Sequence, residues 1–305
     1  MIRVRGLRKA YGDLVAVDGI DLDVADGEIF ALLGPNGAGK TTTVEILEGY
    51  RSRTAGEVTV LGVDPERADV SWRSRVGIVL QEGGRFDELT VGELVHHFAG
   101  FYPRPLPTEE VLGLVGLVDQ HEVRTGRLSG GQRRRLDVAL GLVGDPELVF
   151  LDEPTTGFDP ASRRAAWRVV RDLKALGKTV VLTTHYLDEA EHLADRVGIM
   201  ARGRLVELGP PATLGGRATA EATVRFRADG PLAGAALPGL AALDVQRAGG
   251  TVSVRTTTPT AVVGALSAWA RAAGVDELPE LCVLRPTLED VYLRLVDEGA
   301  GVTPA

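Results

Sequence analysis

One glycine-rich stretch, Gly34-Pro35-Asn36-Gly37-Ala38-Gly39-Lys40-Thr41, limits what this chain can fold into more than any other feature. It fits the pattern G-x-x-x-x-G-K-[ST], in which successive backbone N–H groups surround phosphate oxygens. The apolar run 29–33 before it is typical of a buried strand, and residues 42–48 after it are typical of the first turns of a helix. Glycines let the backbone bend tightly, and the helix N-terminus adds unpaired donors and the positive end of the helix dipole. A glycine-rich turn can match by chance, but the flanking strand and helix are the context that the motif requires.

Two side chains of this stretch carry chemistry of their own. Lys40 can reach the β- and γ-phosphates of a nucleoside triphosphate, and the hydroxyl of Thr41 can bind Mg²⁺. We assign the whole loop and the start of the helix to the nucleotide: Gly34, Pro35, Asn36, Gly37, Ala38, Gly39, Lys40, Thr41 and Thr42.

Four apolar runs share one design that predicts an α/β fold. They are apolar throughout rather than alternating, as expected of parallel strands that are covered on both faces. Helical segments lie between them, and the carboxyl ends of such strands meet at one edge of the sheet, where ligands bind. The four runs are residues 29–33, 76–80, 148–151 and 179–183. The residues that follow them, Gly34, Gln81, Asp152-Glu153 and His185, should therefore converge on one site.

The remaining segments predict two further parts beside this core. Alternating apolar and polar residues at 2–8, 15–24 and 56–62 indicate half-buried strands, and residues 85 to about 145 indicate a mostly helical insert. Pro210-Pro211 and Gly215-Gly216 mark a boundary, so we predict a first domain over 1–215 and a small α+β domain over 220–305.

The composition excludes several classes of protein. With 305 residues, 44% hydrophobic and 25% charged, the chain can bury a full core, and its net charge of −8 disfavours general nucleic-acid binding. Its one cysteine, Cys282, allows neither an intrachain disulfide nor a cysteine-based metal cage. No apolar run approaches the 18 residues or so of a membrane span, and the strand-like start indicates no signal peptide.

The pair Asp152-Glu153 at the end of an apolar run indicates hydrolytic chemistry. Hydrolysis of ATP requires a metal ion, an oriented water molecule and positive charge at the γ-phosphate. Because adjacent residues of an extended chain point opposite ways, we assign Asp152 to Mg²⁺ and Glu153 to the attacking water, as general base or polariser. The alternative is a pair of solvated acids at a strand end.

Two further strand-end residues complete this prediction. Gln81 can contact Mg²⁺ or the water, and His185 can donate a hydrogen bond to a γ-phosphate oxygen. Each is ambiguous alone, because a strand-end glutamine is often a simple hydrogen-bonding residue and His185 can be a buried structural imidazole. Tyr11, before the phosphate-binding loop, can stack on a purine or pack over a hairpin.

A second anion-binding element lies within the helical insert. Ser129, Gly130 and Gly131 place a hydroxyl and two small residues at a helix N-terminus, and Gln132 follows. Because the loop at 34–41 already surrounds one side of a triphosphate, this second element can serve a nucleotide bound to another copy of the chain. The run Arg133-Arg134-Arg135 after it is interpreted as a solvated face or as charge next to ATP.

Together these motifs resemble the nucleotide-binding subunit of an ATP-binding cassette (ABC) transporter, over residues 1 to about 215. The matching residues are Tyr11, the loop 34–41, Gln81, Leu128-Ser129-Gly130-Gly131-Gln132, Asp152-Glu153, Thr156-Gly157-Phe158-Asp159 and His185. The resemblance implies a phosphate-binding-loop ATPase with a RecA-like core, an antiparallel β subdomain and a helical subdomain. It also implies a head-to-tail pair of chains that holds two ATP molecules, each between the loop of one copy and the 128–132 signature of the other.

The same resemblance assigns further roles and partners. Tyr11 would stack on adenine and Asp159 would link the two sites; Phe158 stands where many relatives carry leucine. The ATPase would drive a separate membrane permease at the cytoplasmic face of the membrane, and residues 82–100 would receive a short helix of that permease. The tail 286–293 resembles the daunorubicin-resistance type of ABC ATPase, whose members export drugs, antibiotics, lipids or polysaccharides.

Three other functions compete with export. A soluble ABC-type ATPase of translation or DNA repair would carry two cassettes, coiled coils, zinc insertions or basic arms, none of which is apparent. A phosphate-loop kinase has no need for the 128–132 signature. A non-catalytic scaffold is disfavoured because Glu153 and His185, which inactive relatives often lack, are both present.

Overall fold

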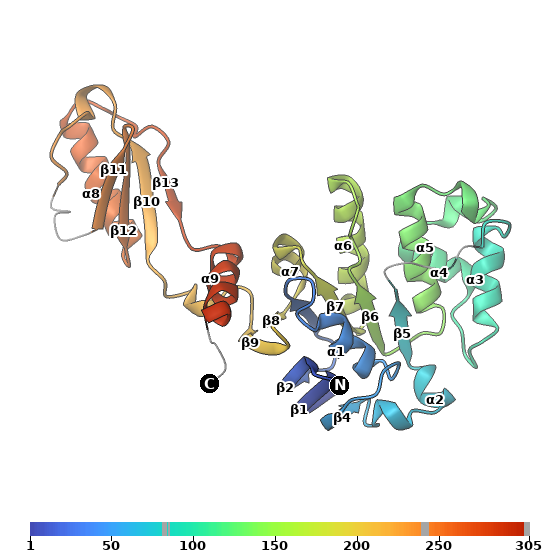
Figure 1. Ribbon diagram of the computed structural model, residues 1–305. Helices are drawn as coiled ribbons and strands as arrows, with labels where there is room; N and C mark the ends of the chain where they lie inside the picture. Colours follow the sequence, from blue (N-terminus) through green and yellow to red (C-terminus); the bar gives the residue numbers. More distant parts are fainter. Residues whose placement is uncertain (81–83, 85, 239–243, 302–305) are drawn as a thin grey trace. The chain divides into compact units, whose positions relative to one another are not determined.

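The computed structural model describes residues 1–80, 84, 86–238 and 244–301. The chain divides into two compact units, which we describe separately: Met1–Pro211 together with Leu295–Ala305, and Ala212–Arg294 (Figure 1).

A six-stranded sheet is the centre of the first unit. Its order is β5-β6-β7-β3-β8-β9. The first five of these strands run parallel, and β9 pairs antiparallel with β8. The strands are β3 (Ile29–Leu33), β5 (Val76–Val79), β6 (Leu148–Asp152), β7 (Thr179–Thr184), β8 (Arg196–Ala201) and β9 (Arg204–Gly209). The four apolar runs thus form parallel neighbours, which confirms the predicted α/β fold.

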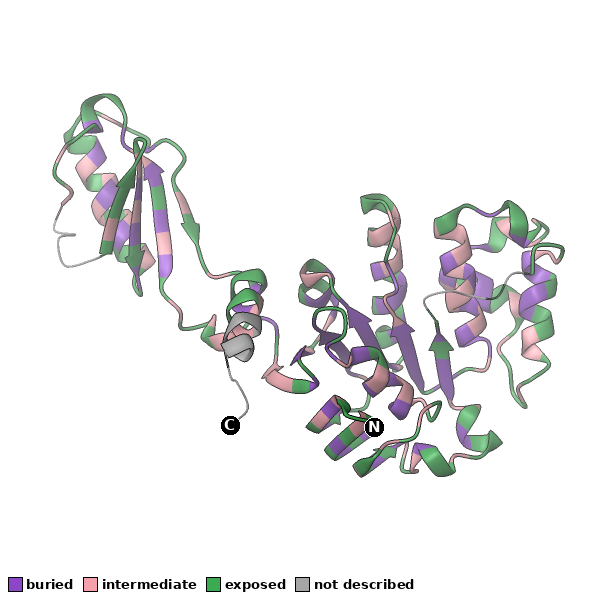
Figure 2. Ribbon diagram, in the orientation of Figure 1, coloured by how far each residue is buried: buried purple, intermediate pink, exposed green. Residues whose placement is uncertain are grey.

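Helices cover both faces of this sheet, which explains why its inner strands are apolar along their whole length (Figure 2). Phe30 and Leu32 of β3 share one buried cluster with Val44 and Leu47 of helix α1 (Lys40–Leu47). The alternate residues of these strands point to the opposite face, where α6 (Pro160–Ala175) and α7 (Leu187–Leu193) contact β7 and β3.

The N-terminal residues form a three-stranded antiparallel sheet of order β2-β1-β4. Its strands are β1 (Ile2–Tyr11), β2 (Leu14–Val24) and β4 (Ala55–Val60). Their alternate apolar residues belong to the same buried cluster as α1 and β3, so the two sheets enclose α1. The predicted antiparallel β subdomain is confirmed.

The predicted helical insert is also confirmed. It contains α3 (Val91–Ala99), α4 (Thr108–Val115) and α5 (Gly130–Leu142). Helix α3 starts at Thr90, whose hydroxyl accepts from the Glu93 N–H while the Glu93 carboxylate accepts from the Thr90 N–H. The insert also holds the 3₁₀ turns Val118–Gln120 and Thr125–Arg127. Short helical turns outside it are α2 (Val70–Arg73) and the 3₁₀ turns Pro65–Arg67, Leu214–Gly216 and Gly230–Leu232.

The second unit is a small α+β fold. Its sheet has the order β11-β12-β10-β13, with strands β10 (Ala222–Arg227), β11 (Asp244–Ala248), β12 (Thr251–Thr256) and β13 (Cys282–Leu284). One face of β10 and β12 is buried against α8 (Pro259–Ala272). Helix α9 (Leu288–Gly301) crosses the boundary between the units, since residues from Leu295 onward group with the first one. Our expectation of a continuous second domain over 220–305 misses this, because no proline or glycine marks a boundary inside a continuous helical stretch.

Candidate active site

The loop between β3 and α1 has a backbone that only glycine accommodates at two positions. Gly39 has φ of 99°, and a Cβ there would lie 2.4 Å from the Ala16 carbonyl oxygen. A Cβ on Gly34 would lie 2.5 Å from the Met200 carbonyl oxygen. The loop is therefore held between β2 and β8 with its backbone exposed toward the ligand side.

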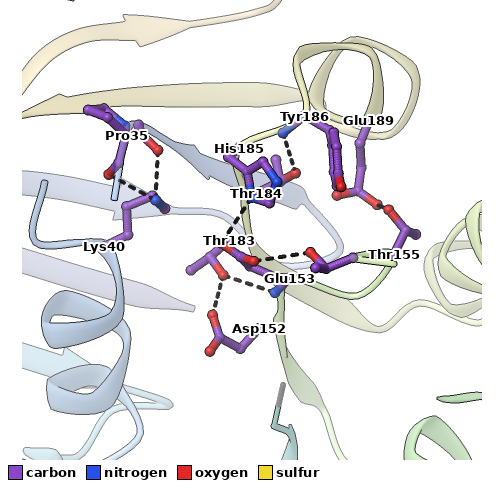
Figure 3. Close-up of polar contacts among 12 residues, drawn as sticks. Pro35, Lys40, Asp152, Glu153, Thr155, Thr183, Thr184, His185, Tyr186 and Glu189 are labelled. Atoms are coloured by element: carbon purple, nitrogen blue, oxygen red, sulfur yellow. Dashed lines mark hydrogen bonds and ion pairs between the residues drawn. The ribbon is translucent and has the colours of Figure 1, made fainter. Parts of the chain in front are cut away.

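Lys40 is folded back onto this loop. Its Nζ donates to the carbonyl oxygens of Gly34, at 2.7 Å, and of Pro35, at 3.1 Å, and the residue is 5% exposed (Figure 3). Burial lowers the pKa of the Lys40 ammonium, while the nearby carboxylates of Glu153 and Asp152 oppose that effect. A buried ammonium that is hydrogen-bonded to carbonyl oxygens is well suited to bind an incoming anion.

A cavity of about 520 Å³ opens in front of the loop, within the size range of small-molecule sites. Its lining joins the start of α1 to the first two strands and to the end of β6. The lining residues are Tyr11, Leu14, Ala16, Asn36, Gly37, Gly39, Lys40, Thr41, Thr42 and Glu153.

Tyr11 ends β1 at the rim of this cavity and is 40% exposed. Lys9 Nζ lies 4.9 Å and Arg51 Cζ 5.5 Å from the centroid of its ring. These cation–π contacts hold the ring without burying it. Tyr11 is thus a partly exposed aromatic in the cavity wall, at the β1–β2 hairpin.

Asp152 ends β6, Glu153 follows it, and the two have different partners. The Thr183 hydroxyl on β7 donates to Asp152 Oδ1, and the Glu153 N–H donates to both oxygens of Thr183 (Figure 3). Glu153 Oε2 accepts from the Thr156 hydroxyl at 3.0 Å. Glu153 has φ of 44°, so the chain has already left the extended conformation. Our reason for separating the two roles, the alternation of an extended strand, is therefore wrong, but the two carboxylates are separated by their contacts.

His185 follows β7 and meets Glu153. Its Nδ1 lies 3.1 Å from Glu153 Oε1, and its ring centroid lies 4.1 Å from that of Tyr186 (Figure 3). Since a carboxylate only accepts, Nδ1 carries the proton of this bond. His185 is partly exposed, so the alternative of a fully buried structural imidazole does not hold.

Three of the four predicted strand ends therefore converge. The phosphate-binding loop, Asp152-Glu153 and His185 lie together, as predicted. Gln81 and the start of the predicted permease-docking segment, including Glu82, lie outside the described residues.

The signature residues begin helix α5 and are occupied with its N-terminus. The Ser129 hydroxyl accepts from the Gln132 N–H at 3.2 Å, and Gln132 Oε1 accepts from the Ser129 N–H at 2.9 Å. Ser129 and Gly130 are exposed, and residues 129–132 do not line the cavity at the loop of their own chain.

Asp159 caps α6 close to the signature. Its Oδ1 accepts from the N–H groups of Ala161 and Ser162, and the hydrogen bond from the Ser162 hydroxyl is the main reason that the pKa of Asp159 is lowered. A Cβ on Gly131 would lie 3.2 Å from Ser162 Oγ, so the start of α5 and the start of α6 are neighbours.

Sequence reasoning missed two buried charged residues around the site. Glu189 of α7 is fully buried, which raises the pKa of its carboxyl, and it accepts from Thr155 Oγ1 at 2.8 Å and Trp167 Nε1 at 3.2 Å. It thereby joins the turn after Glu153 to the helix after His185. In the sequence, the one sign of this buried role is that Glu189 stands among apolar positions of a helix.

Arg134 of α5 is the second such residue. It is 8% exposed, so our interpretation of the run as a solvated face is wrong for this residue. Its guanidinium donates to the carbonyl oxygens of Asp152, at 2.7 Å, of Pro154, at 3.3 Å, and of Leu80. The signature helix is thus tied directly to the end of β6.

Comparisons with known protein families agree with these features. The family model described as "ABC transporter" matches residues 17–156, and a model for an "ABC transporter domain-containing protein-like, C-terminal domain" matches residues 222–287. The daunorubicin resistance ATP-binding protein DrrA3 of Streptomyces coeruleorubidus is 37% identical over 313 residues, covering 100% of this chain and 98% of the relative. The Nod factor export ATP-binding protein I of Rhizobium meliloti is 38% identical over 302 residues, covering 96% and 87%.

Solved structures share the fold of the first part of the chain. The cassette cbiO1 of Clostridium perfringens, part of the ABC transporter complex cbiONQ, has a TM-score of 0.63 at 28% identity and covers 69% of this chain and 88% of its own. The ATP-binding cassette MJ0796, solved as a dimer bound to ADP and Pi, has a TM-score of 0.62 at 24% identity, with 69% and 98% covered. The phosphate-binding loop, the strand-end carboxylates and the full-length relatives lead to one conclusion: this chain belongs to the ABC transporter family, as one of its ATPase subunits.

Proposed function

We propose that this chain hydrolyses ATP to power the export of a drug, antibiotic or lipid-like compound through a separate membrane permease. The observation that carries the catalytic part is the position of Glu153, which lines the same cavity as Lys40 and Thr41 and contacts His185. The relatives named for daunorubicin resistance and for Nod factor export support the export direction and the substrate class.

In this proposal the site residues act on the attacking water, the phosphates, the metal and the adenine. Glu153 orients and activates the attacking water, His185 acts on the γ-phosphate, and Gln81 contacts the metal or the water. With Nδ1–H directed at Glu153, the neutral His185 ring presents Nε2 as an acceptor, so donation to a phosphate oxygen from Nε2 requires the protonated ring. The loop residues 34–42 bind the phosphates and Tyr11 stacks on the adenine.

We propose Mg²⁺ as the metal, held by Thr41, Asp152 and Gln81. The described donors suit a hard cation, because the Thr41 hydroxyl lines the cavity and Asp152 uses only Oδ1 in its hydrogen bond with Thr183. When bound, Mg²⁺ neutralises charge on the triphosphate.

We further propose a head-to-tail dimer in which Ser129, Gly130, Gly131 and Gln132 of one copy complete the ATP site of the other. Three features support it: these residues start a 13-residue helix, Ser129 and Gly130 among them are exposed, and all four lie outside the cavity of their own chain. Asp159, which is hydrogen-bonded to Ser162 near Gly131, would join the two sites across the interface. The dimeric cassette among the solved structures supports the same arrangement.

The permease places the chain at the cytoplasmic face of the membrane in this proposal. Among the described residues, no helix has the length and apolar character needed to cross a bilayer. The helical insert, including residues 82–100, is the surface proposed to receive a short cytoplasmic helix of the permease.

The substitution Glu153→Gln tests the catalytic part. Removing the carboxylate while keeping its shape should lower the steady-state ATPase rate at least about a hundredfold, the usual contribution of a positioned base. ATP binding, measured with a fluorescent analogue, and ATP-dependent dimer formation should persist. Hydrolysis at the wild-type rate would refute the role of Glu153.

A further inference from the structure

The ring of Tyr186 lies against that of His185, and the proposed mechanism gives Tyr186 no role. The two ring centroids are 4.1 Å apart, and the rings are tilted by 39° (Figure 3). Tyr186 stands between the end of β7 and the start of α7, where its N–H donates to Thr184 Oγ1 at 2.9 Å. The side chain that follows the histidine is therefore in contact with it rather than turned away.

Arg163 of α6 covers the Tyr186 ring. Its Cζ lies 4.4 Å from the centroid of that ring, which is within the range of a cation–π contact. Its Nη1 also lies 3.2 Å from Oδ2 of Asp188, in the first turn of α7. The Nε of Arg163 is buried and has no hydrogen-bond partner in the described part of the chain. Stacking on the ring and the ion pair, rather than a full set of hydrogen bonds, thus hold the guanidinium in place.

The packing of α7 on α6 fixes this contact at a second level. Trp167 lies four residues after Arg163 and so on the same face of α6. Its indole stacks on His192 with the ring centroids 4.9 Å apart, and its Nε1 donates to the buried Glu189. The position of Arg163 relative to Tyr186 is therefore set by two packed helices and not by one flexible side chain.

The first turn of α6, which carries Arg163, is itself well anchored. The Arg163 N–H donates to the Asp159 carbonyl oxygen at 2.9 Å. The preceding residue, Ser162, would have its Oγ 3.2 Å from a Cβ on Gly131. The turn that supports Tyr186 is thus the same one that neighbours the start of the signature helix.

His185 needs such a support because its other contact fixes only one atom of the ring. Its Nδ1 lies 3.1 Å from Glu153 Oε1, and one hydrogen bond leaves the imidazole free to rotate about that bond. The His185 side chain is 37% exposed, so the core packs against only part of it. An aromatic ring lying against the imidazole restricts this rotation and therefore the direction in which Nε2 points.

We propose that Tyr186 and Arg163 are a positioning pair for His185: Arg163 holds the Tyr186 ring, and that ring holds the imidazole with Nε2 directed at the γ-phosphate. The inference rests on the proposed function, in which His185 acts on that phosphate. Neither member of the pair lines the nucleotide cavity, so both act through His185. Their loss should lower kcat and leave KM for ATP unchanged, because the loop residues that bind the nucleotide are untouched.

The first experiment removes the aromatic ring and measures steady-state ATP hydrolysis by the full chain. Tyr186→Leu should lower kcat about tenfold or more at unchanged KM, since a small misplacement of a reacting group costs up to about a hundredfold. Tyr186→Phe should keep most of the wild-type rate, because the ring makes the contact with His185. Loss of the rate with Tyr186→Phe, or a normal rate with Tyr186→Leu, contradicts the proposal.

A double-mutant cycle separates positioning of His185 from a general structural role. Tyr186→Leu should change kcat little in the His185→Ala background, because its effect passes through the missing imidazole. An equal fold-loss in both backgrounds overturns the proposal. If His185→Ala alone hydrolyses ATP at the wild-type rate, the proposed role of His185 fails and this inference with it. An impaired His185→Ala beside a normal Tyr186→Leu refutes this inference alone.

The second experiment keeps the Tyr186 ring and removes the cation that covers it. Arg163→Gln should lower kcat about threefold at unchanged KM, the size expected for loss of a cation–π contact, and this loss should vanish in the His185→Ala background. Arg164→Gln is the matched control, because Arg164 is exposed and points about 100° away around the same helix. Equal rates in the two variants overturn the pair, and this comparison decides the question even where Tyr186→Leu does not fold.

Discussion

At the scale of single residues, the buried carboxyls differ in how their charge is accommodated. Glu189 and Glu48 both have pKa values raised mainly by burial, but Glu189 accepts hydrogen bonds from Thr155 and Trp167. Glu48 has no such donor in the described part of the chain. The first arrangement favours a rigid structural link, whereas the second leaves a destabilising charge.

This charge gives Glu48 a measurable effect on stability. Its pKa is about 7 in the folded chain and near 4.5 when unfolded, so the folded state holds the proton more tightly. The free energy of unfolding should therefore fall as pH rises from 4.5 through 7, by about 2 to 3 kcal/mol. Urea unfolding with EDTA should show Glu48→Gln more stable than wild type at pH 8, with a gap below about 1 kcal/mol at pH 5. Parallel pH profiles for the two proteins would contradict this.

Much of the site could be predicted from the sequence because its residues lie in short local motifs. Gly39 and Lys40 belong to a loop whose conformation depends on local glycines, and the carboxylates follow an apolar strand. Glu189, Arg134 and Glu48 could not be predicted in this way, since their burial depends on which helices pack together. The positive φ of Glu153 also has no local sequence signal.

At the scale of elements, α5 connects the signature to the hydrolytic residues. Its N-terminus carries Ser129 and its second turn carries Arg134, which binds carbonyl oxygens at the ends of β5 and β6. A shift of α5 on contact with a second nucleotide would therefore act directly on the backbone of Asp152. The sequence predicts α5 and its start, but the hydrogen bonds from the Arg134 guanidinium to three carbonyl oxygens are seen only in the folded chain.

We expect Arg134→Lys to uncouple this connection. Lysine keeps the charge but cannot span three carbonyl oxygens, so buried acceptors lose their donors at a cost of about 1 to 3 kcal/mol. The ATPase rate should fall about tenfold while affinity for ATP is retained, because Lys40 and the loop are unchanged. Arg133→Lys is the matched control, since Arg133 makes one long hydrogen bond of 3.5 Å to Thr125. A normal ATPase rate in Arg134→Lys would show that α5 does not position Asp152.

At the scale of the whole molecule, the two elements that we propose to bind phosphate do not meet within one chain. The loop at 34–41 contributes to the lining of its own cavity, and the signature at 129–132, where Ser129 and Gly130 are exposed, lies outside that cavity. A symmetric dimer brings such elements together twice, once at each site. In the proposed dimer, a single folded chain therefore supplies only half of each site.

Complementation between two inactive variants tests this arrangement. Lys40→Ala removes the lysine of the loop, and Gly130→Asp adds a carboxylate to the signature, where a side chain meets open space and an acid suits the helix N-terminus of its own chain. Each variant alone should be inactive. In a mixed dimer, the loop of the Gly130→Asp chain faces the intact signature of the Lys40→Ala chain, so one site of two is complete. An equal mixture should therefore recover up to about a quarter of wild-type ATPase activity, since half of randomly formed dimers are mixed.

Mixing Lys40→Ala with Glu153→Gln should recover nothing, because both changes lie on the loop side of the site and every possible pairing lacks one of them. If the first mixture also stays inactive while mixed dimers form, each chain must complete its ATP site without the signature of its partner.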